Sequence, residues 1–342
     1  MGALACGCGG QAITSGSGSG DSAHDMPSIP GPATVTPRKP TTPGTLATYG
    51  IAGIGIALYP ADLSASTQPL TLLEGSWHTD ACDSLSFGSA GDLFALCYQA
   101  VDSEPPDQVV VFSADAQGTD APTRVITGPS TTLGGYATNL AVGATGKVYV
   151  NQDAYCEVQD CAGMVSVFAP GANGDSAPVQ VIQGPHTGLN YSSSIAVDAA
   201  GLIYVGNAEG GPILVFAADA TGDAQPIRRI GRAKEIGDAT SLAVDASGTI
   251  YVADVTTTKG VLVYGPSAAD GAPPDRVIAG PLTGLAAPSG IAVDSAGRVL
   301  VSEEHGLQDP GTVSIFASGA SGNVAPETVL SNVAGMGIAI AP

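Results

Sequence analysis

Basic residues are scarce in this chain: Lys and Arg together number 11, against 31 Asp and Glu, which gives a formal net charge of −20 at pH 7. This balance argues against nucleic acid as a partner, because binding to phosphates relies on a basic surface. An anionic membrane surface would repel the protein for the same reason. The sequence also lacks the uninterrupted run of about eighteen apolar residues that a membrane-spanning helix needs, so none is predicted.

Charged residues of either sign are few, and so are the signatures of nucleophilic enzymes. Only 12% of the 342 residues are charged and 44% are hydrophobic, so the chain can bury an extensive core. The Gly-x-Ser-x-Gly motif of serine hydrolases is absent, since Ser and Gly simply alternate from Ser15 to Gly20. The sequence therefore predicts a large folded domain without a recognisable nucleophile.

What the sequence has in abundance is internal repetition. In the stretch from Ile195 to Phe216, two short apolar runs are joined by Asp198-Ala-Ala-Gly201 and a third follows after a loop. This composition predicts a tight antiparallel hairpin, because Asp accepts backbone hydrogen bonds in the turn and Gly adopts a positive φ. Close copies of the hairpin start at Leu85, Leu140, Leu242 and Ile291.

Two further strands complete each repeat. A third strand ends in an aromatic residue six times along the chain, at Tyr59, Phe112, Phe168, Phe216, Tyr264 and Phe316, with spacings of 48 to 56 residues. After each comes a proline followed four residues later by a large aliphatic residue, which predicts a short fourth strand at a sheet edge. A period near fifty residues with four short strands is typical of propeller blades.

The two ends of the repeat region together supply one blade. Gly337 to Ile340 is a first strand without its successors, whereas the strands expected at 44–48, 56–59 and 70–73 are strands two to four without a first. Pairing them closes the ring with hydrogen bonds. The predicted fold is therefore all-β, a six-bladed β-propeller of four-stranded antiparallel blades in which a C-terminal strand joins the N-terminal blade.

The repeat resembles the NHL family of six-bladed propellers. Pro288-Ser-Gly290-Ile-Ala-Val-Asp294 and Gly248-Thr-Ile-Tyr-Val-Ala-Asp254 are similar to the typical NHL pattern, and the resemblance extends from Gly44 to the end of the chain. It supports the fold prediction. It leaves the function open, because this architecture serves enzymes and binding scaffolds alike.

The first 43 residues are expected to be a flexible leader, and residues 44–342 to form the propeller. Gly and Ser alternate near the start, and the segment from Pro27 to Pro43 is rich in proline. The segment Met1 to Cys8 resembles the end of a bacterial lipoprotein signal, in which Cys6 or Cys8 would carry the lipid. The basic and long apolar parts of such a signal are missing, so a chance resemblance stays open.

The remaining four cysteines predict two disulfides. Cys82 and Cys97 lie at ends of one hairpin that face each other, and Cys156 and Cys161 share one loop. Free buried thiols and a zinc site are the alternatives, although no second Cys pair or nearby His completes a zinc site. Two disulfides favour an extracytoplasmic location, either secreted or lipid-anchored at the cell surface.

The resemblance also indicates where a site would lie. Enzymes related to the NHL family, such as amidating lyases and gluconolactonase-like hydrolases, hold a central metal with side chains at the mouth of the channel. The residues expected just before the innermost strands contain no carboxylate or imidazole, so the metal cage of such enzymes is not recognised here. These residues are Ser84, Asn139, Ser194, Ser241, Gly290 and Gly337.

Polar residues farther out on the same loop face are the candidate ligand-binding residues. They are Glu303, Glu304, His305, Asp254 and Asn207, which follow second strands, and His186, which lies between a fourth strand and the next first strand. Oxygen ligands of this kind could bind a polar ligand or a divalent cation such as Ca²⁺, although no cofactor is required by the pattern. Alternatively, Asp254 and Asn207 cap loop backbone and the two glutamates are solvated. His78 and His186 come from a different type of loop than His305, so a three-His zinc site is not expected.

A basic cluster on one outer strand has two interpretations. Arg228, Arg229, Arg232 and Lys234 hold four of the eleven basic residues. They could receive an anionic partner, or they could keep an exposed sheet edge from pairing with other chains.

Taken together, these features favour a monomeric, non-catalytic scaffold that binds a protein, a glycan or a small ligand on its loop face. The alternative is a metal-dependent lyase or lactonase-type hydrolase with a site on the same face. A structural surface protein, in which the ring is a spacer, is a third possibility.

Overall fold

The structure is a computed structural model that describes residues 41–342 except 50–54, 76–80, 99–106, 135–136, 154–162, 209, 233–234, 304–310 and 334–336. The chain divides into two units, Met1–Thr36 and Pro37–Pro342, and all described residues belong to the second. Residues 1–40 of the predicted leader therefore lie outside the described residues, and Cys6 and Cys8 are among them.

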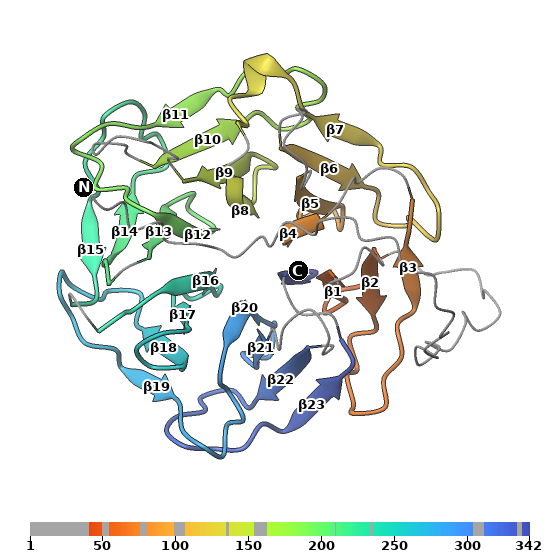
Figure 1. The fold of residues 1–342 in the computed structure, drawn as a ribbon, viewed down its shortest axis with the longest axis vertical. Coiled ribbons are helices and arrows are strands. Elements are labelled where there is room, and N and C mark those ends of the chain that lie inside the picture. Colours follow the sequence, from red (N-terminus) through yellow and green to blue (C-terminus); the bar gives the residue numbers. More distant parts are fainter. Residues whose placement is uncertain are drawn as a thin grey trace, which may run out of the picture. The chain divides into compact units, whose positions relative to one another are not determined.

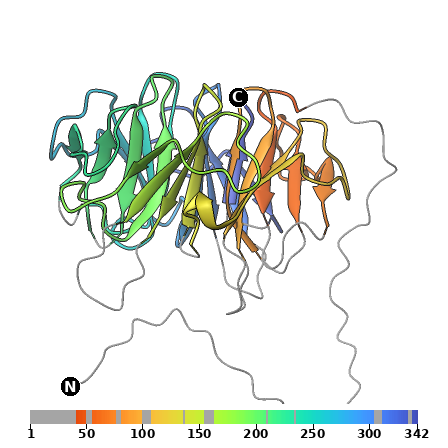
Figure 2. The ribbon, with the colours of Figure 1, turned by 90° about the horizontal axis from the view of Figure 1, so that it is seen from above.

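The described residues form six antiparallel four-stranded sheets, the blades, arranged around a common centre (Figures 1 and 2). Blade 1 has the order β24 (Gly337–Ile340), β1 (Leu46–Tyr49), β2 (Ile56–Tyr59), β3 (Thr71–Leu73). Blade 2 contains β4 (Ala81–Phe87), β5 (Leu93–Tyr98), β6 (Gln108–Phe112) and β7 (Arg124–Ile126), and blade 3 contains β8 (Ala137–Val142), β9 (Val148–Gln152), β10 (Met164–Phe168) and β11 (Gln180–Ile182). Blade 4 contains β12 (Ser192–Val197), β13 (Ile203–Asn207), β14 (Ile213–Phe216) and β15 (Arg228–Ile230), and blade 5 contains β16 (Ala239–Val244), β17 (Ile250–Asp254), β18 (Gly260–Tyr264) and β19 (Arg276–Ile278). Blade 6 contains β20 (Pro288–Val293), β21 (Val299–Glu303), β22 (Thr312–Phe316) and β23 (Thr328–Ser331), and one 3₁₀ turn, η1 (Pro129–Thr131), follows β7.

The predicted closure of the ring is confirmed. β24 pairs antiparallel with β1, in a register that runs from Leu46 opposite Ile340 to Tyr49 opposite Gly337. The last strand of the chain thus becomes the innermost strand of blade 1, so that the six blades all contain four strands.

The hairpin turns form as the sequence predicts. In blade 4, Asp198 Oδ1 accepts hydrogen bonds from the backbone amides of Ala200 at 2.9 Å and Leu202 at 2.8 Å, and Gly201 has a φ of +83°. The Tyr204 hydroxyl donates to Asp198 Oδ2 at 3.1 Å. The aspartates of these turns therefore shape the backbone, which is the usual role of Asp in a turn.

The hydrophobic core lies between blades. Six clusters of buried residues occur, and each combines side chains of two adjacent blades, as where Phe168 of blade 3 packs with Val111 and Ile126 of blade 2. The aromatic residues that end the third strands are buried, and burial of one such side chain contributes about 1.5–3 kcal/mol. Because the inner strands are covered on both faces, their apolar residues are consecutive.

A recurring hydrogen bond on the outer rim connects neighbouring blades. The turn after the third strand of one blade accepts a backbone hydrogen bond from the preceding blade: Asp175 from Ser130 at 2.6 Å, and Asn323 from Leu282 at 2.7 Å. These donors lie in a repeated Gly-Pro-x-Thr-x-Leu segment, which begins at Gly128, Gly184 and Gly280. The segment and its partner turn hold adjacent blades in register.

Candidate functional site

A cavity of about 440 Å³ lies between the innermost strands β4, β8, β12, β16, β20 and β24, which surround the centre of the ring in Figure 1. Its lining changes along the strands. The earliest lining residues in five strands are polar, namely Asp83, Thr138, Ser193, Thr240 and Ser289. The last residues of the six strands are apolar, namely Phe87, Val142, Val197, Val244, Val293 and Ile340. The cavity therefore has a polar end where the inner strands begin and an apolar end where they finish.

The polar end is produced by a bulge in each of these five inner strands. In blade 4, Ser192 is opposite Asn207 and Ser194 is opposite Gly206, so Ser193 is an extra residue without a partner in the ladder. The same irregularity occurs at the matching residues of the other four strands. A bulge turns a side chain away from the regular alternation of a strand, and here it brings an additional polar residue to the cavity wall.

The bulge hydroxyls are bonded to the next blade. Thr138 Oγ1 donates to the backbone carbonyl of Ser192 at 3.2 Å, Ser193 Oγ to that of Ala239 at 2.7 Å, and Thr240 Oγ1 to that of Pro288 at 2.8 Å. These protons are thus committed to carbonyl oxygens. The hydroxyl oxygens can still accept hydrogen bonds from the cavity, although Thr138 Oγ1 already accepts one from Asn151 Nδ2 at 3.0 Å.

Asp83 is the residue that the sequence analysis missed. The wall was expected to begin at Ser84, which itself bonds to blade 3 by donating to Asn139 Oδ1 at 3.0 Å and accepting from the Leu140 amide at 3.0 Å. The bulge extends the wall by one residue, so Asp83 also lines the cavity. The signal was present in the sequence, because the residues one position earlier in five repeats are all Asp, Ser or Thr.

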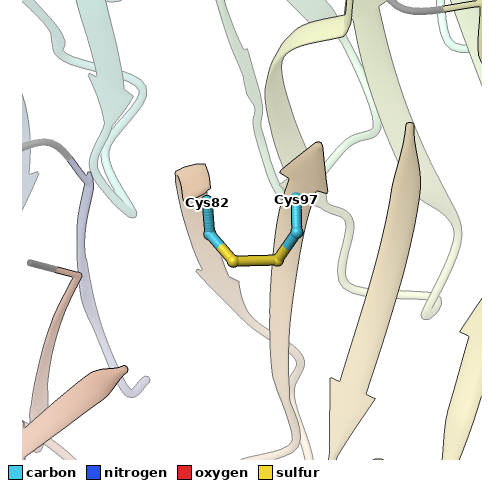
Figure 3. The surroundings of a disulfide bond; sticks show 2 residues. All are labelled: Cys82 and Cys97. Atoms are coloured by element: carbon cyan, nitrogen blue, oxygen red, sulfur yellow. A yellow bond between two sulfur atoms is a disulfide. The ribbon is translucent and has the colours of Figure 1, made fainter. Parts of the chain in front are cut away.

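One of the two predicted disulfides is confirmed and lies directly beside Asp83. Cys82 and Cys97 face each other across β4 and β5 and are bonded through their sulfur atoms (Figure 3). Both are fully buried in the core between blades 1 and 2. The bond ties the bulge of β4 to its neighbour, and a loop of this length corresponds to about 3 kcal/mol of stabilisation in the chain-entropy treatment.

Three of the candidate ligand-binding residues occupy one equivalent position at the end of the second strand, where blade 2 has Cys97. Asp254 is 0% exposed, and its carboxylate accepts from five backbone amides, the shortest being Thr258 at 2.6 Å and Asp238 at 3.0 Å. Glu303 is 1% exposed and accepts from Ala286 at 2.5 Å and Ala287 at 2.9 Å.

Asn207 also forms hydrogen bonds with loop backbone, in blade 4. Its Oδ1 accepts from the amide of Asn190 at 3.3 Å, and its Nδ2 donates to the carbonyl of Gly188 at 3.0 Å. The position therefore connects the second strand of a blade to the loop that precedes the first strand. This geometry matches the capping alternative for Asp254 and Asn207, and it extends to Glu303.

His186 lies elsewhere, on the outer contact between blades 3 and 4. Its Nδ1 is 2.5 Å from Asp223 Oδ2, and its backbone amide donates to Asp223 Oδ1 at 2.7 Å. The imidazole is 66% exposed. The hydrogen bond from the His186 side chain, with those from the His186 and Thr187 amides, holds the pKa of Asp223 below its usual value of 3.8. The structure thus does not bring His186 together with Asp254 or Glu303.

The remaining candidates lie outside the described residues: His78, Glu304, His305, Cys156, Cys161 and Lys234. Within the described part of the chain, no group of three or more His, Cys, Asp or Glu side chains is arranged to hold a metal ion. The same part of the chain contains no helix with the length and apolarity to cross a bilayer.

Two side chains of the basic cluster contribute to the contact between blades 4 and 5. Arg228 donates to the carbonyl of Pro266 at 2.9 Å and lies 5.9 Å from the centre of the Tyr204 ring. Arg232 Nε donates to the carbonyl of Gly271 at 3.0 Å. Arg124 and Arg276 make equivalent bonds in other blades, so this arginine recurs as a connection between blades.

The described geometry defines a six-bladed β-propeller, and comparison with solved structures agrees. The chain is similar to a candidate 6-phosphogluconolactonase from Bacteroides fragilis, with a TM-score of 0.54, 12% sequence identity, and coverage of 86% of this chain and 97% of that one. It is also similar to a luciferin-regenerating enzyme, with a TM-score of 0.51, 10% identity, and coverage of 84% and 96%. No protein-family model and no curated protein matches the chain. The likenesses establish the propeller fold, whereas membership of the NHL family stays a prediction.

Proposed function

We propose that the protein is a non-catalytic binding scaffold that acts outside the cytoplasm. The observation that carries the proposal is that the buried carboxylates on the loop face accept hydrogen bonds from the loop backbone. Asp254 and Glu303 are two buried acidic residues on this face, and their oxygens already accept hydrogen bonds from loop amides. A carboxylate held in this way stabilises a rigid loop frame, which is the feature that binding proteins need.

The disulfide supports the location. Cys82 and Cys97 are bonded and fully buried. Disulfides persist in oxidising compartments and are rare in the cytosol. Secretion and lipid anchoring are equally consistent with this bond, and labelling of cells that express the full chain with a radioactive fatty acid, compared between wild type and Cys6→Ala or Cys8→Ala, separates them.

A metal-dependent lyase or lactonase-type hydrolase is the competing function. It would use Glu303 together with Glu304 and His305, which follow it in the sequence. The two solved neighbours described above carry the names of enzymes, but a likeness at 10–12% identity concerns the fold and not the activity.

Metal content decides between the two functions. The experiment is elemental analysis of natively purified protein, together with melting curves before and after EDTA for the wild type and for His305→Ala. The scaffold proposal predicts no stoichiometric divalent ion and the same melting temperature with and without EDTA. A stoichiometric ion in the wild type, lost in His305→Ala and accompanied by a lower melting temperature after chelation, would replace the scaffold by the metalloenzyme.

A further inference from the structure

We propose that the central cavity binds a protonated aliphatic amine, with the ammonium group at the Asp83 end and the hydrocarbon chain along the inner strands. The inference rests on the proposed function, because it treats the protein as a binding protein, and it specifies the class of ligand. It depends on three features of the cavity: the type of polar atom at one end, the single charge there and the apolar wall beyond it.

The polar end offers acceptors for hydrogen bonds. The hydroxyl protons of Thr138, Ser193 and Thr240 are donated to backbone carbonyls of the next blade. Ser289 Oγ is likewise within 3.2 Å of Ser302 Oγ in its own blade. A ligand in the cavity therefore meets oxygen lone pairs, which favour a ligand that is rich in N–H donors.

The charge at this end is negative. Asp83 is the one ionisable side chain among the described residues that line the cavity. Asp83 lines the cavity at its polar end, in a protein whose net charge is −20, and a carboxylate there favours a cation. An ammonium ion supplies both the positive charge and three N–H donors, and an aliphatic amine is protonated at pH 7 as a lysine side chain is.

The wall beyond the polar end is suited to a hydrocarbon chain. From Asp83 to Phe87 the strand advances by four residues, or about 13 Å at 3.3 Å per residue. Over this length blade 4 lines the cavity with Ile195, Ala196 and Val197 and blade 6 with residues 290–293, which are all aliphatic or small, whereas Ser84 and Ser86 of blade 2 remain polar. Apolar surface of this kind gains from covering methylene groups, and an extended six-carbon chain is shorter than the wall and fits within it.

The position of Asp83 is fixed by its surroundings. The disulfide of Cys82 holds the bulge against β5. On the other side, β24 approaches so closely that a Cβ added to Gly337 would lie 3.0 Å from the Asp83 carbonyl oxygen. A carboxylate on a rigid strand binds with less loss of conformational freedom than one on a loop, which favours a defined site.

The test is isothermal titration calorimetry of the full chain with hexan-1-amine, with hexan-1-ol and hexanoate as neutral and anionic probes of the same length. The proposal predicts binding of the amine at one site and no measurable binding of hexanoate. The variant Asp83→Asn keeps the shape and removes the charge, and is expected to weaken amine binding by about 10- to 100-fold, the factor that corresponds to a charge-assisted hydrogen bond. The matched control Asp62→Asn changes the net charge equally at an exposed turn of blade 1 and is expected to bind like the wild type.

Two series on the wild type make the test independent of how well a variant folds. Hexan-1-amine must bind more tightly than hexan-1-ol, and shortening the amine from six carbons to four must weaken binding by about threefold to fourfold for each methylene group removed. Equal affinity for amine and alcohol, or an effect of Asp62→Asn as large as that of Asp83→Asn, would overturn the proposal while leaving the scaffold function intact. Consumption of the bound amine, followed by proton NMR, would overturn the non-catalytic function and leave the amine site standing.

Discussion

Replacing Asp254 with Ala removes the acceptor for five backbone amides at once. The donors lie on two segments, the loop before β16 and the turn after β17, and three of the N–O distances are 3.2 Å or less. Alanine leaves these amides without a partner inside the fold. Asp254→Ala should therefore destabilise the protein more than a surface substitution does.

The expected size follows from the three shorter bonds. A hydrogen bond to a charged group contributes about 1.5–3 kcal/mol, but the amides of Asp238 and Thr258 are only partly buried, and water replaces part of the lost interaction. We expect Asp254→Ala to lower the free energy of unfolding by about 2–4 kcal/mol. Asp254→Asn keeps one acceptor oxygen and should lose about half as much.

The assay is equilibrium unfolding in urea followed by circular dichroism, with Asp219→Ala as the control. Asp219 is exposed on the turn after β14, and its replacement is expected to change the free energy of unfolding by less than about 0.5 kcal/mol. Hydrogen exchange should be faster at the Thr258 amide in Asp254→Ala. Loss of stability no larger than that of the control would refute the assignment of Asp254 as a structural cap.

Three further predictions concern the contacts between strands and blades. Replacing both Cys82 and Cys97 with Ala should lower the free energy of unfolding by about 3 kcal/mol, measured in urea without reductant. Because the pKa of Asp223 is lowered in the folded state by its bonds to His186, its contribution is present above pH 3.8, the usual value, and is lost as the pH falls through the lowered pKa. The difference in stability between wild type and Asp223→Asn, measured in urea from pH 7 to pH 2, should therefore shrink below about pH 4. Gly184→Ala, at a φ of +148° and with its new Cβ against the Asp223 carboxylate, should destabilise by about 1–3 kcal/mol in the same assay.

Each of these predictions has a control. Reductant should destabilise the wild type more than the double alanine variant, and an equal effect on both would contradict the disulfide contribution. A stability difference for Asp223→Asn that stays constant down to pH 2 would contradict the linkage. Gly171 has a φ of +78° but nothing within 4 Å of a new Cβ, so Gly171→Ala should cost less than Gly184→Ala, and the reverse order would contradict the contact with Asp223.

The fold could be predicted from the sequence because its main determinants are local and repeated. Asp198 and Gly201 fix a hairpin turn within four residues, and the apolar runs on both sides indicate which strands are buried. The closure of the ring by Gly337 to Ile340 followed from counting strands, since the N-terminal blade lacked a first strand and the C-terminal end supplied one. The Cys82–Cys97 bond followed from the hairpin register.

The wall of the cavity could not be predicted in the same way. That Asp83 lines it in addition to Ser84 depends on a bulge, which is a property of strand pairing and leaves no mark on the apolar pattern. The role of Glu303 depends on where the loop at Ala286 and Ala287 lies, and that loop belongs to the stretch before the first strand of the same blade. The contact of Asp223 with blade 3 joins residues 37 positions apart in the sequence, so only the packed ring brings them together.

The central claim is that the ring of inner strands encloses the binding site. A crystal structure of the full chain grown with hexan-1-amine tests it most directly. The account predicts density for the ligand in the cavity, with its nitrogen within hydrogen-bonding distance of the Asp83 carboxylate and its carbon chain along β4 and β12. An empty cavity at a ligand concentration that saturates binding in solution, or ligand bound only on the outer surface of the blades, would contradict it.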